Sequence, residues 1–437
     1  MAEHQFCKNG SSELNSKELG VGGSTPSTGL NEKREKMKFF EKGELKILWP
    51  FYLESFFAYV IQFAPAFSII YFLSLGMSLT KIGFLLAVIP LSSLIFEIPT
   101  GAIADIYGRK FSVLLGYFLE GIAMFLIFFT QNYSTLVIIF IFWGAVATFS
   151  SGSWEAWIVD LVKKKNKKLV QTFFSKSKFI QSIALILSGI IGALFVKMFG
   201  LSLIWIVSGF SFFIGIILLL PAQEIKEKRK VNGNNGHLKN LYIQSKKSIS
   251  YSIKHPVLLY LLIADFFMII SVAFAESLAY VPFLSNLGMP NYAFGYFWSA
   301  TWLVMAIAPL CSKKFLGKHK EVNFLFVVTL IGSLILLLVY FAYSYLSAIL
   351  IIIISLFFFG LKYPIERPYF HKFVPNKLRA TVGSFKSMIC SFAGIIALPI
   401  GGFLIDLIGA RLLIIISALL GIPTLIAYLF IKENKSL

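Results

Sequence analysis

The sequence predicts an all-α integral membrane protein with twelve transmembrane helices in two pseudosymmetric six-helix bundles. The first observation behind this prediction is composition, because 57% of the 437 residues are hydrophobic and only 14% are charged, far from the balance of soluble domains. The second is that apolar runs recur along the chain at about the 20-residue length needed to cross roughly 30 Å of hydrocarbon. The third is a long polar gap that divides these runs into six and six.

Each apolar run is interpreted as a helix, because backbone exposed to lipid must satisfy its hydrogen bonds within the segment. The alternating pattern of a membrane β-barrel is absent from these runs. The expected helices cover residues 47–75, 82–104, 111–130, 135–161, 177–197, 201–220, 257–284, 291–311, 322–341, 345–364, 383–406 and 411–431.

Polar segments divide the chain into five parts. Residues 1–40 are too poor in apolar groups to build a core, so they are expected to form a disordered cytoplasmic tail. Residues 41–220 and 256–432 are the two predicted bundles. The basic, Asn/Gly-containing stretch 221–255 is the predicted cytoplasmic loop between them, and residues 433–437 form a short cytoplasmic tail.

A weak internal repeat supports two related halves. Glu54 in the first expected helix corresponds to Asp265 in the seventh, one position out of register. Lys176 near the fifth helix corresponds to Lys386 in the eleventh with a similar slip. Matches that recur in the same order favour an ancestral duplication.

Basic residues predict the orientation. The loops on one side contain only Lys81, Lys197 and Arg411. The positive-inside rule therefore predicts a multi-pass protein of the inner (plasma) membrane with both termini in the cytoplasm. The alternate loops, expected in the cytoplasm, carry Arg109 and Lys110, then Lys163, Lys164, Lys165, Lys167 and Lys168, then Lys226 through Lys254, then Lys313, Lys314, Lys318 and Lys320, then Arg367, Lys372, Lys377 and Arg379.

Several function classes are excluded. The net charge of +19 does not indicate nucleic-acid binding, because the cations fall in short clusters between apolar runs. Cys7, Cys311 and Cys390 lack the spacing of a metal site or a disulfide framework. The five histidines lie outside the expected helix cores. The chain is therefore expected to hold no metal and no cofactor, and not to be an enzyme.

The segment 101–110, GAIADIYGRK, lies between the second and third expected helices. It resembles the loop signature G-x-x-x-D-x-x-G-R-K of the major facilitator superfamily. The resemblance implies a secondary transporter that works as a monomer, with a substrate cavity between the two bundles near the bilayer midplane. The family commonly has an arginine where this chain has Ile106.

The resemblance also implies a gating role for this loop. Gly101 would allow a close helix approach, and Asp105 would face the positive N-terminus of the eleventh helix. Gly108 would permit the turn, and Arg109, followed by Lys110, would hold a carboxylate. That carboxylate is expected to be Asp160, at the cytoplasmic end of the fourth helix.

Acidic residues inside the expected helices are functional candidates, because an ionisable group near the bilayer core costs several kcal/mol. Glu54, Asp265, Glu97 and Glu155 are the candidates for proton coupling. For Glu97, a structural ion pair with Lys386 is an equal alternative. Two further interpretations are structural: Glu120 as a locally paired acid, and Asp406 paired with Arg411 across the opposite turn.

The substrate-cavity candidates are Tyr59 and Gln62, which continue the first helix from Glu54, and Glu276, three turns beyond Asp265. Most other aromatic residues are expected to pack or to lie at the membrane interface. The aromatic residues considered as less favoured candidates are Trp154, Trp157, Trp298, Trp302 and Tyr363.

These observations predict a proton-coupled exporter of a small amphipathic or cationic organic molecule, whose partners are that molecule, protons and the lipid bilayer. The G-P-x-x-G-G signature of proton antiporters is absent from the fifth helix, where Ser188–Gly192 stands, which weakens the antiport interpretation. One alternative is a proton-coupled importer of a sugar, peptide or organic acid. A second is a membrane receptor or scaffold that transports nothing.

Overall fold

The computed structural model describes residues 40, 43–163, 167–225, 247–317 and 320–431. Residues 43–225 are called the N-half below, and residues 247–431 the C-half. The predicted N-terminal tail, most of the predicted central loop, the C-terminal tail and several loop lysines lie outside the described residues.

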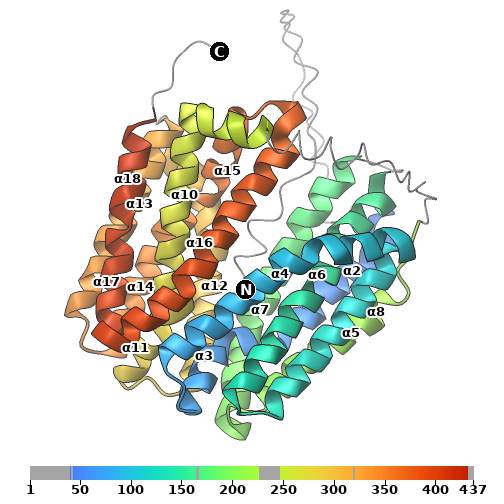
Figure 1. Ribbon diagram of the computed structural model, residues 1–437, viewed down its shortest axis with the longest axis horizontal. Coiled ribbons are helices and arrows are strands. Elements are labelled where there is room, and N and C mark those ends of the chain that lie inside the picture. The colour runs from blue at the N-terminus through green and yellow to red at the C-terminus, as the bar shows by residue number, and fades with distance from the viewer. Residues whose placement is uncertain (1–39, 41–42, 164–166, 226–246, 318–319, 432–437) are drawn as a thin grey trace, which may run out of the picture.

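The N-half contains the first six expected spans, the first of them divided into two helices (Figure 1). Pro65 lies in the first turn of the second piece, where its missing N–H costs no hydrogen bond. The helices are α2 (Glu44–Val60), α3 (Ala64–Ser74), α4 (Leu79–Tyr107), α5 (Arg109–Phe128), α6 (Tyr133–Lys163), α7 (Lys167–Phe199) and α8 (Ile204–Leu219).

The C-half repeats this plan, and its first span is interrupted by a π-helical turn. Its elements are α10 (Pro256–Phe274), the π-helical turn η1 (Ala275–Ala279), α11 (Tyr280–Asn286), α12 (Ala293–Leu316), α13 (Glu321–Leu337), the 3₁₀ turn η2 (Leu338–Phe341), α14 (Tyr345–Gly360), α15 (Tyr363–Lys372), the 3₁₀ turn η3 (Asn376–Leu378), α16 (Arg379–Ile408), α17 (Ala410–Leu419) and α18 (Gly421–Leu429).

The predicted all-helical membrane fold is confirmed. Within the described residues, eleven helical segments are long and apolar enough to cross a membrane, and α8, with 16 residues, is a shorter apolar helix at the place of the sixth expected span. One difference lies in the predicted central loop, where residues 247–254 are helical. This segment packs on the C-half, because Tyr251 donates a hydrogen bond to the Phe373 carbonyl at 3.1 Å.

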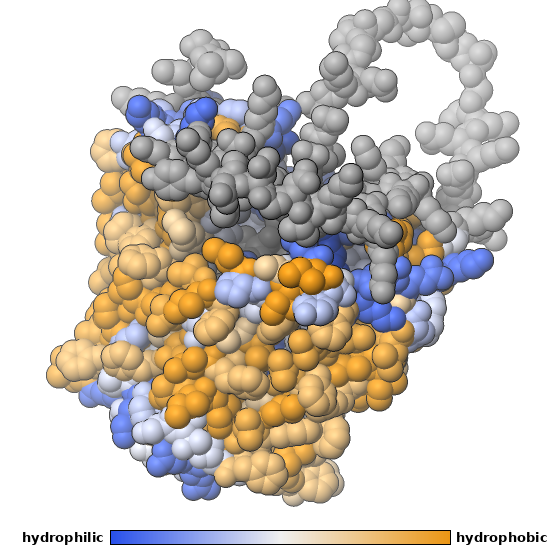
Figure 2. All heavy atoms as spheres, turned by 45° about the vertical axis from the view of Figure 1, so that its right-hand side comes forward, coloured by the Kyte–Doolittle hydropathy of each residue, from blue (hydrophilic) through white to orange (hydrophobic). Residues whose placement is uncertain are grey.

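Apolar side chains cover the outside of the helices, as a lipid environment requires. Ile98, Leu310 and Tyr343 are about four-fifths exposed (82%, 80% and 79%). In Figure 2, hydrophobic residues form a broad belt, and hydrophilic residues gather toward the ends of the molecule. A soluble protein would not leave so much apolar surface in water.

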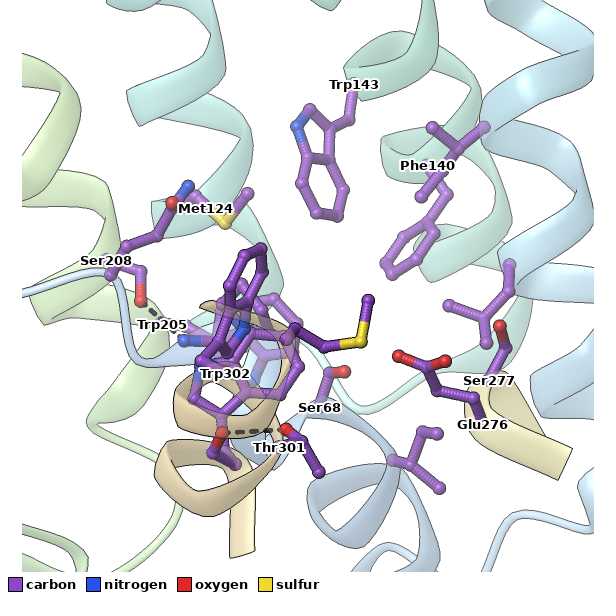
Figure 3. A pocket seen from close by; sticks show the side chains of 18 of the residues that line it. Ser68, Met124, Phe140, Trp143, Trp205, Ser208, Glu276, Ser277, Thr301 and Trp302 are labelled. Carbon is purple, nitrogen blue, oxygen red and sulfur yellow. Dashed lines mark hydrogen bonds between the residues drawn. The ribbon is translucent and has the colours of Figure 1, made fainter. Parts of the chain in front are cut away.

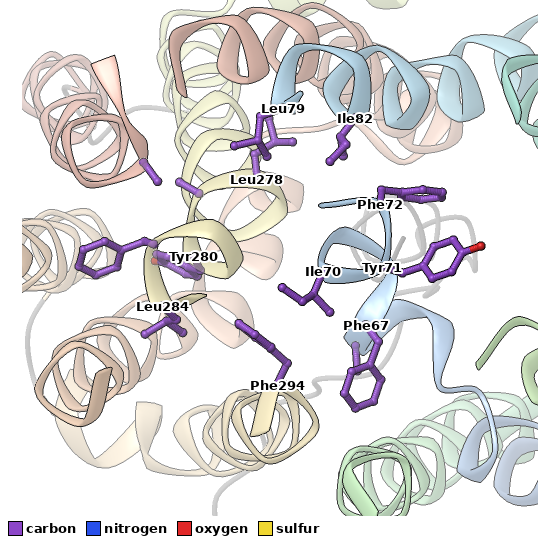
Figure 4. Close-up of a cluster of buried hydrophobic side chains, with 14 of the residues drawn as sticks. Phe67, Ile70, Tyr71, Phe72, Leu79, Ile82, Leu278, Tyr280, Leu284 and Phe294 are labelled. Atoms are coloured by element: carbon purple, nitrogen blue, oxygen red, sulfur yellow. The ribbon is translucent and has the colours of Figure 1, made fainter. Parts of the chain in front are cut away.

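Among the described residues, the two halves share a hydrophobic core at one end of the molecule. The end that carries Arg109 and Asp160 is called the Arg109 side, and the end that carries Asp406 and Arg411 the Asp406 side. Toward the Asp406 side, one hydrophobic cluster joins both halves, and Figure 4 shows residues of α3 and α4 facing residues of η1, α11 and α12. Toward the Arg109 side, each half has its own separate cluster. The halves are therefore joined on the Asp406 side and diverge toward the Arg109 side.

Asp406 connects the halves at the end of α16. Its carboxylate accepts hydrogen bonds from the backbone N–H of Leu79 at 3.0 Å and of Thr80 at 2.8 Å, and from the Thr80 hydroxyl at 2.6 Å. These N–H groups belong to the first turn of α4, which has no intrahelical acceptors and carries positive partial charge. The predicted pair of Asp406 with Arg411 is therefore wrong, because Arg411 donates to the carbonyls of Tyr340 and Ala342.

Candidate functional site

A cavity of about 180 Å³ lies between the two halves. Figure 3 shows side chains of this cavity, whose lining comes from α3, α4, α5, α6 and α8 of the N-half, from Gln62 before α3, and from η1, α12 and α15 of the C-half. The lining is mostly apolar, six of its residues are aromatic, and Glu276 is its one carboxylate among the described residues. Its aromatic members are Phe140, Trp143, Trp205, Trp298, Trp302 and Tyr363.

The first helix of each half is interrupted beside this cavity. In the N-half, the break between α2 and α3 leaves backbone groups that side chains satisfy: Ser188 donates to the Gln62 carbonyl at 3.0 Å, and Ser208 accepts from the Ala64 N–H at 2.8 Å. In the C-half, η1 carries Glu276 and Ser277 into the cavity wall. Paired interruptions in corresponding helices are typical of transporter binding sites.

The structure divides the predicted cavity residues. Gln62 and Glu276 line the cavity, but Tyr59 is not among the residues that do. Trp298 and Trp302, which the sequence ranked lower, line it too and meet edge to face with ring centroids 5.9 Å apart. Tyr59 and Gln62 were favoured because they were expected to continue the helix of Glu54. That reasoning failed for Tyr59, because α2 ends at Val60 and Gln62 lies beyond the end of the helix.

Of the other aromatic candidates, Tyr363 lines the cavity, whereas Trp154 and Trp157 lie elsewhere in the N-half. The indole N–H of Trp157 donates to the Gln223 carbonyl at 2.8 Å, and its ring packs edge to face on Phe51. Trp157 is therefore a packing residue near the Arg109 side.

Glu54 is buried inside the N-half, with 1% of its surface exposed. Tyr117 of α5 donates a hydrogen bond to its carboxyl group at 2.8 Å, and the neighbouring Ser55 bonds Ser177 of α7 at 2.8 Å. Glu54 is not among the cavity-lining residues. The carboxyl group of Glu54 therefore joins α2 to α5 inside the N-half and does not face the cavity.

Asp265 lies in a cluster of charges within the C-half. Its carboxylate is 2.8 Å from the ammonium of Lys386 on α16, and Lys386 is also 3.3 Å from Glu366 on α15. Lys362 contributes a second ammonium 3.8 Å from Glu366. These side chains are between 5% and 22% exposed, so the charges compensate one another in a poorly solvated place.

The remaining acidic candidates have different surroundings. Glu97 is exposed on α4, and Lys386 forms its ion pairs with Asp265 and Glu366, so the alternative of a Glu97–Lys386 pair is not supported. Glu155 is partly buried on α6 and lies outside the cavity lining. Glu120 accepts a hydrogen bond from Ser150 at 2.8 Å, as expected of a locally paired structural acid.

The predicted 101–110 loop is helical except at Gly108, because it comprises the last turns of α4 and the start of α5, and it ties together three parts of the N-half. Arg109 pairs with Asp160 at 2.7 Å and donates to the Ala156 carbonyl, so the start of α5 is fastened to the end of α6. Lys110 donates to the carbonyls of Leu220 and Ala222 at 2.6 and 2.8 Å, just after α8. The contact predicted between Arg109 and Asp160 is present, and it lies within one half.

Two glycines of this loop differ in their surroundings. Gly108 has φ 104°, a conformation that residues with a Cβ rarely adopt, and it forms the turn between α4 and α5. Gly101 is exposed, and a Cβ added there would meet nothing within 4 Å. The expectation that Gly101 supports a close helix approach is wrong for this conformation, because the halves diverge there. Asp105 is exposed in the last turns of α4.

Sequence reasoning missed Lys178 and Lys362. Lys178 of α7 stands over the Trp302 ring, 5.8 Å from its centroid, and donates to Gln181 at 2.8 Å. Lys362 follows α14 and reaches Glu366 one turn later. Both are lysines inside otherwise apolar runs, so a search for intramembrane cations as well as acids would have found them.

Two helical halves around a central cavity, with interrupted helices beside it, define a secondary-transporter fold. The sequence matches the Major Facilitator Superfamily model over residues 51–397. The chain therefore belongs to the major facilitator superfamily and is a multi-pass membrane transporter of the MFS type.

Its relatives support this assignment. The chain is 24% identical over 388 residues to the uncharacterized MFS-type transporter YxaM of Bacillus subtilis (strain 168), covering 85% of this chain and 92% of that protein. It is 23% identical over 176 residues to the uncharacterized MFS-type transporter MJ1560 of Methanocaldococcus jannaschii, covering 39% and 45% of the two chains.

Solved structures show the same fold. The nucleoside transporter NupG superposes with a TM-score of 0.72 at 12% identity, over 89% of this chain and 99% of NupG. A bacterial homolog of the human lysosomal transporter Spinster, in an inward-facing and occupied conformation, superposes with a TM-score of 0.67 at 13% identity, over 89% and 97%.

Proposed function

We propose that this protein is a proton-coupled secondary active transporter that exports a small amphipathic or cationic organic molecule by alternating access. The observation that carries the proposal is the cavity between the halves, where the aromatic lining suits an apolar body and Glu276 suits a positive group. The shared core on the Asp406 side supports a cavity that is closed to that side.

The proposed orientation follows from the basic residues, which gather on the Arg109 side. With that side in the cytoplasm of the cell, the described conformation corresponds to the inward-facing state. A cytoplasmic molecule would then enter the cavity between the diverging ends of the halves. Closing this side while opening the Asp406 side would release it outside.

The cluster around Lys386 is the proposed link to protons. Protonation of Asp265 would remove one of the charges that hold Lys386, and Lys386 lies on α16, the same helix that carries Asp406 at its other end. A proton drives the change only if it binds the two states with different affinity, and a pair whose geometry depends on the position of α16 meets that condition. Glu54, Glu97 and Glu155 remain further candidates.

The 101–110 loop is proposed to act in the opposite, outward-facing state. When the halves close on the Arg109 side, Asp105 at the end of α4 would meet the N-terminus of α16, which starts at Arg379. The Arg109–Asp160 pair would keep the loop in shape for this contact.

Replacing Asp160 with asparagine tests this role of the loop. Because the Arg109 and Asp160 side chains are 18% and 30% exposed, loss of their pair is expected to cost about 1 kcal/mol of stability or less. Transport is nevertheless expected to fall severalfold, since the loop would lose its shape. The initial transport rate and the melting temperature of Asp160→Asn are both compared with those of the wild-type protein. An unchanged transport rate would contradict the proposed role.

Transport assays in vesicles test the function itself. A library of organic cations and neutral amphipathic compounds is screened in everted vesicles with an imposed proton gradient. Some compounds are expected to accumulate in the vesicle lumen while protons leave it. Accumulation in right-side-out vesicles alone would indicate an importer instead. Absence of proton movement with every compound would favour the receptor or scaffold alternative.

A further inference from the structure

Glu276 is an acidic residue whose carboxylate faces a cavity and not a protein partner. It lies on the π-helical turn η1, and Figure 3 shows its carboxylate directed into the cavity, which Ser68 and Phe140 also line. No hydrogen bond or ion pair joins it to another side chain in the described part of the chain. Single π-helical turns inside α-helices occur frequently at functional sites.

Three other acids of the spans have protein partners. Glu54 bonds Tyr117, Glu120 bonds Ser150, and Asp265 pairs with Lys386. Their carboxyl groups are therefore stabilised by hydrogen bonds or an ion pair within the protein. Glu276 is the carboxylate left to interact with whatever enters the cavity.

The walls around Glu276 suit an organic cation. Aromatic faces carry negative electrostatic potential and attract ammonium groups. The structure contains one such contact already, since the Lys178 ammonium stands 5.8 Å from the centre of the Trp302 ring. Trp298 adds a second indole wall beside Trp302.

A metal ion does not fit this place. Divalent cations need several oxygen ligands, and the described residues contain no group of three histidine, cysteine or acidic side chains able to hold a metal. One carboxylate in an aromatic cavity matches one positive charge on an organic body.

We propose that Glu276 determines the specificity of the cavity for molecules with a single ammonium group on a flat apolar body. The carboxylate binds the ammonium group, and the indole rings of Trp298 and Trp302 contact the body. Lys178 is bound by Gln181 at 2.8 Å and lies over Trp302, so it disfavours a second positive charge at that wall. This inference rests on the proposed function, since it names the class of molecule that the transporter would carry.

Binding of three matched probes tests the inference. Tryptamine carries an ammonium group, tryptophol replaces it with a neutral hydroxyl, and tryptophan adds a carboxylate to the same indole body. Affinities are measured by calorimetry on the purified protein in detergent at neutral pH. Tryptamine is expected to bind about 10–100-fold more tightly than tryptophol, the range of a hydrogen bond to a charged group.

Variants distinguish recognition of the ammonium group by Glu276 from a general effect of removing an acidic residue. Glu276→Gln is nearly isosteric and is expected to bind tryptamine and tryptophol equally, while Glu276→Asp keeps the preference for the ammonium. Glu120→Gln is the control, because it removes a buried acid outside the cavity lining and is expected to keep the full preference. Elution of each variant as one symmetrical size-exclusion peak verifies folding.

The inference is overturned if wild-type protein shows no preference for tryptamine or does not bind it at millimolar concentration, or if Glu276→Gln keeps the preference. It is also overturned if tryptophan binds most tightly and Lys178→Met abolishes that advantage, which would identify a zwitterion site. Charge-selective binding without proton-driven flux would reject the proposed function alone. Proton-driven flux of neutral compounds, unchanged in Glu276→Gln, would reject this inference alone.

Discussion

Replacing Lys386 with methionine is expected to give the largest loss of folded protein among single substitutions in the C-half. The ammonium of Lys386 lies 2.8 Å from Asp265 and 3.3 Å from Glu366, and its removal leaves two poorly exposed carboxyl groups without their shared cation. Breaking a buried pair from one side costs about 3–5 kcal/mol. The melting temperature and yield of purified protein are the measurements.

Two variants give this prediction its controls. The double variant Lys386→Met with Asp265→Asn is expected to recover most of the stability, because Glu366 keeps Lys362 at 3.8 Å. Lys314→Met removes an exposed lysine at the end of α12 and is expected to change stability by less than about 0.5 kcal/mol. If Lys386→Met and Lys314→Met have the same melting temperature, the charge cluster around Lys386 does not stabilise the C-half.

The double variant also addresses coupling. It is expected to fold but to move substrate without proton dependence, since the group proposed to bind the proton is gone. Normal proton-driven transport by this variant would transfer the coupling role to another acid, with Glu54 the first to examine.

Replacing Asp406 with alanine is expected to shift the conformational equilibrium more than any other substitution of a side chain that bridges the halves. Three hydrogen bonds from the first turn of α4 would be lost. Because the site is exposed at the surface, we expect a total loss of about 2 kcal/mol, or roughly a 30-fold change in the ratio of the two states. The Asp406 side would open more often.

Labelling of a cavity cysteine measures this shift. Ser68, which lines the cavity, is changed to cysteine after Cys7, Cys311 and Cys390 are replaced by serine. An impermeant maleimide added from the Asp406 side is expected to react faster in Asp406→Ala than in the parent. Arg411→Ala is the matched control on the same side, because Arg411 donates hydrogen bonds to carbonyls of the C-half and lies over the rings of Phe283 and Tyr343 in the same half. Equal labelling of Asp406→Ala and the parent would show that other contacts close this side.

Glycine contacts explain why the Asp406 side packs so closely. A Cβ added to Gly402 of α16 would lie 3.0 Å from the Cα of Thr80, and one added to Gly83 of α4 would meet the backbone of Leu398. Small residues allow such backbone approach between membrane helices. The carboxylate of Asp406 can therefore reach the backbone N–H groups of α4.

Much of this fold could be predicted because lipid imposes a simple rule on sequence. Every span needs a long apolar run, and these runs were visible from 47–75 to 411–431. Charge in the loops predicted which ends lie on the same side, and the resemblance of residues 101–110 to the family signature implied the turn at Gly108 and the pair of Arg109 with Asp160.

The partners of intramembrane charges were harder to predict. The sequence argument weighed Glu97 as the partner of Lys386, whereas the packing of α10, α15 and α16 selects Asp265 and Glu366. Asp406 was assigned to Arg411 because they are close in sequence, but α4 presents unpaired backbone N–H groups that no side-chain pattern reveals.

The sequence by itself determined the class of the molecule, the approximate number and bounds of its spans, and the segment by which the family is recognised. Tertiary structure alone decided which side is closed and which acid faces the cavity. Glu54 and Glu276 are both glutamates in the first helix of a half, but Tyr117 binds one while the other lies on a π-helical turn beside the cavity. The reason is physical: hydropathy follows from each residue alone, whereas the role of a buried charge depends on neighbours far away in the chain.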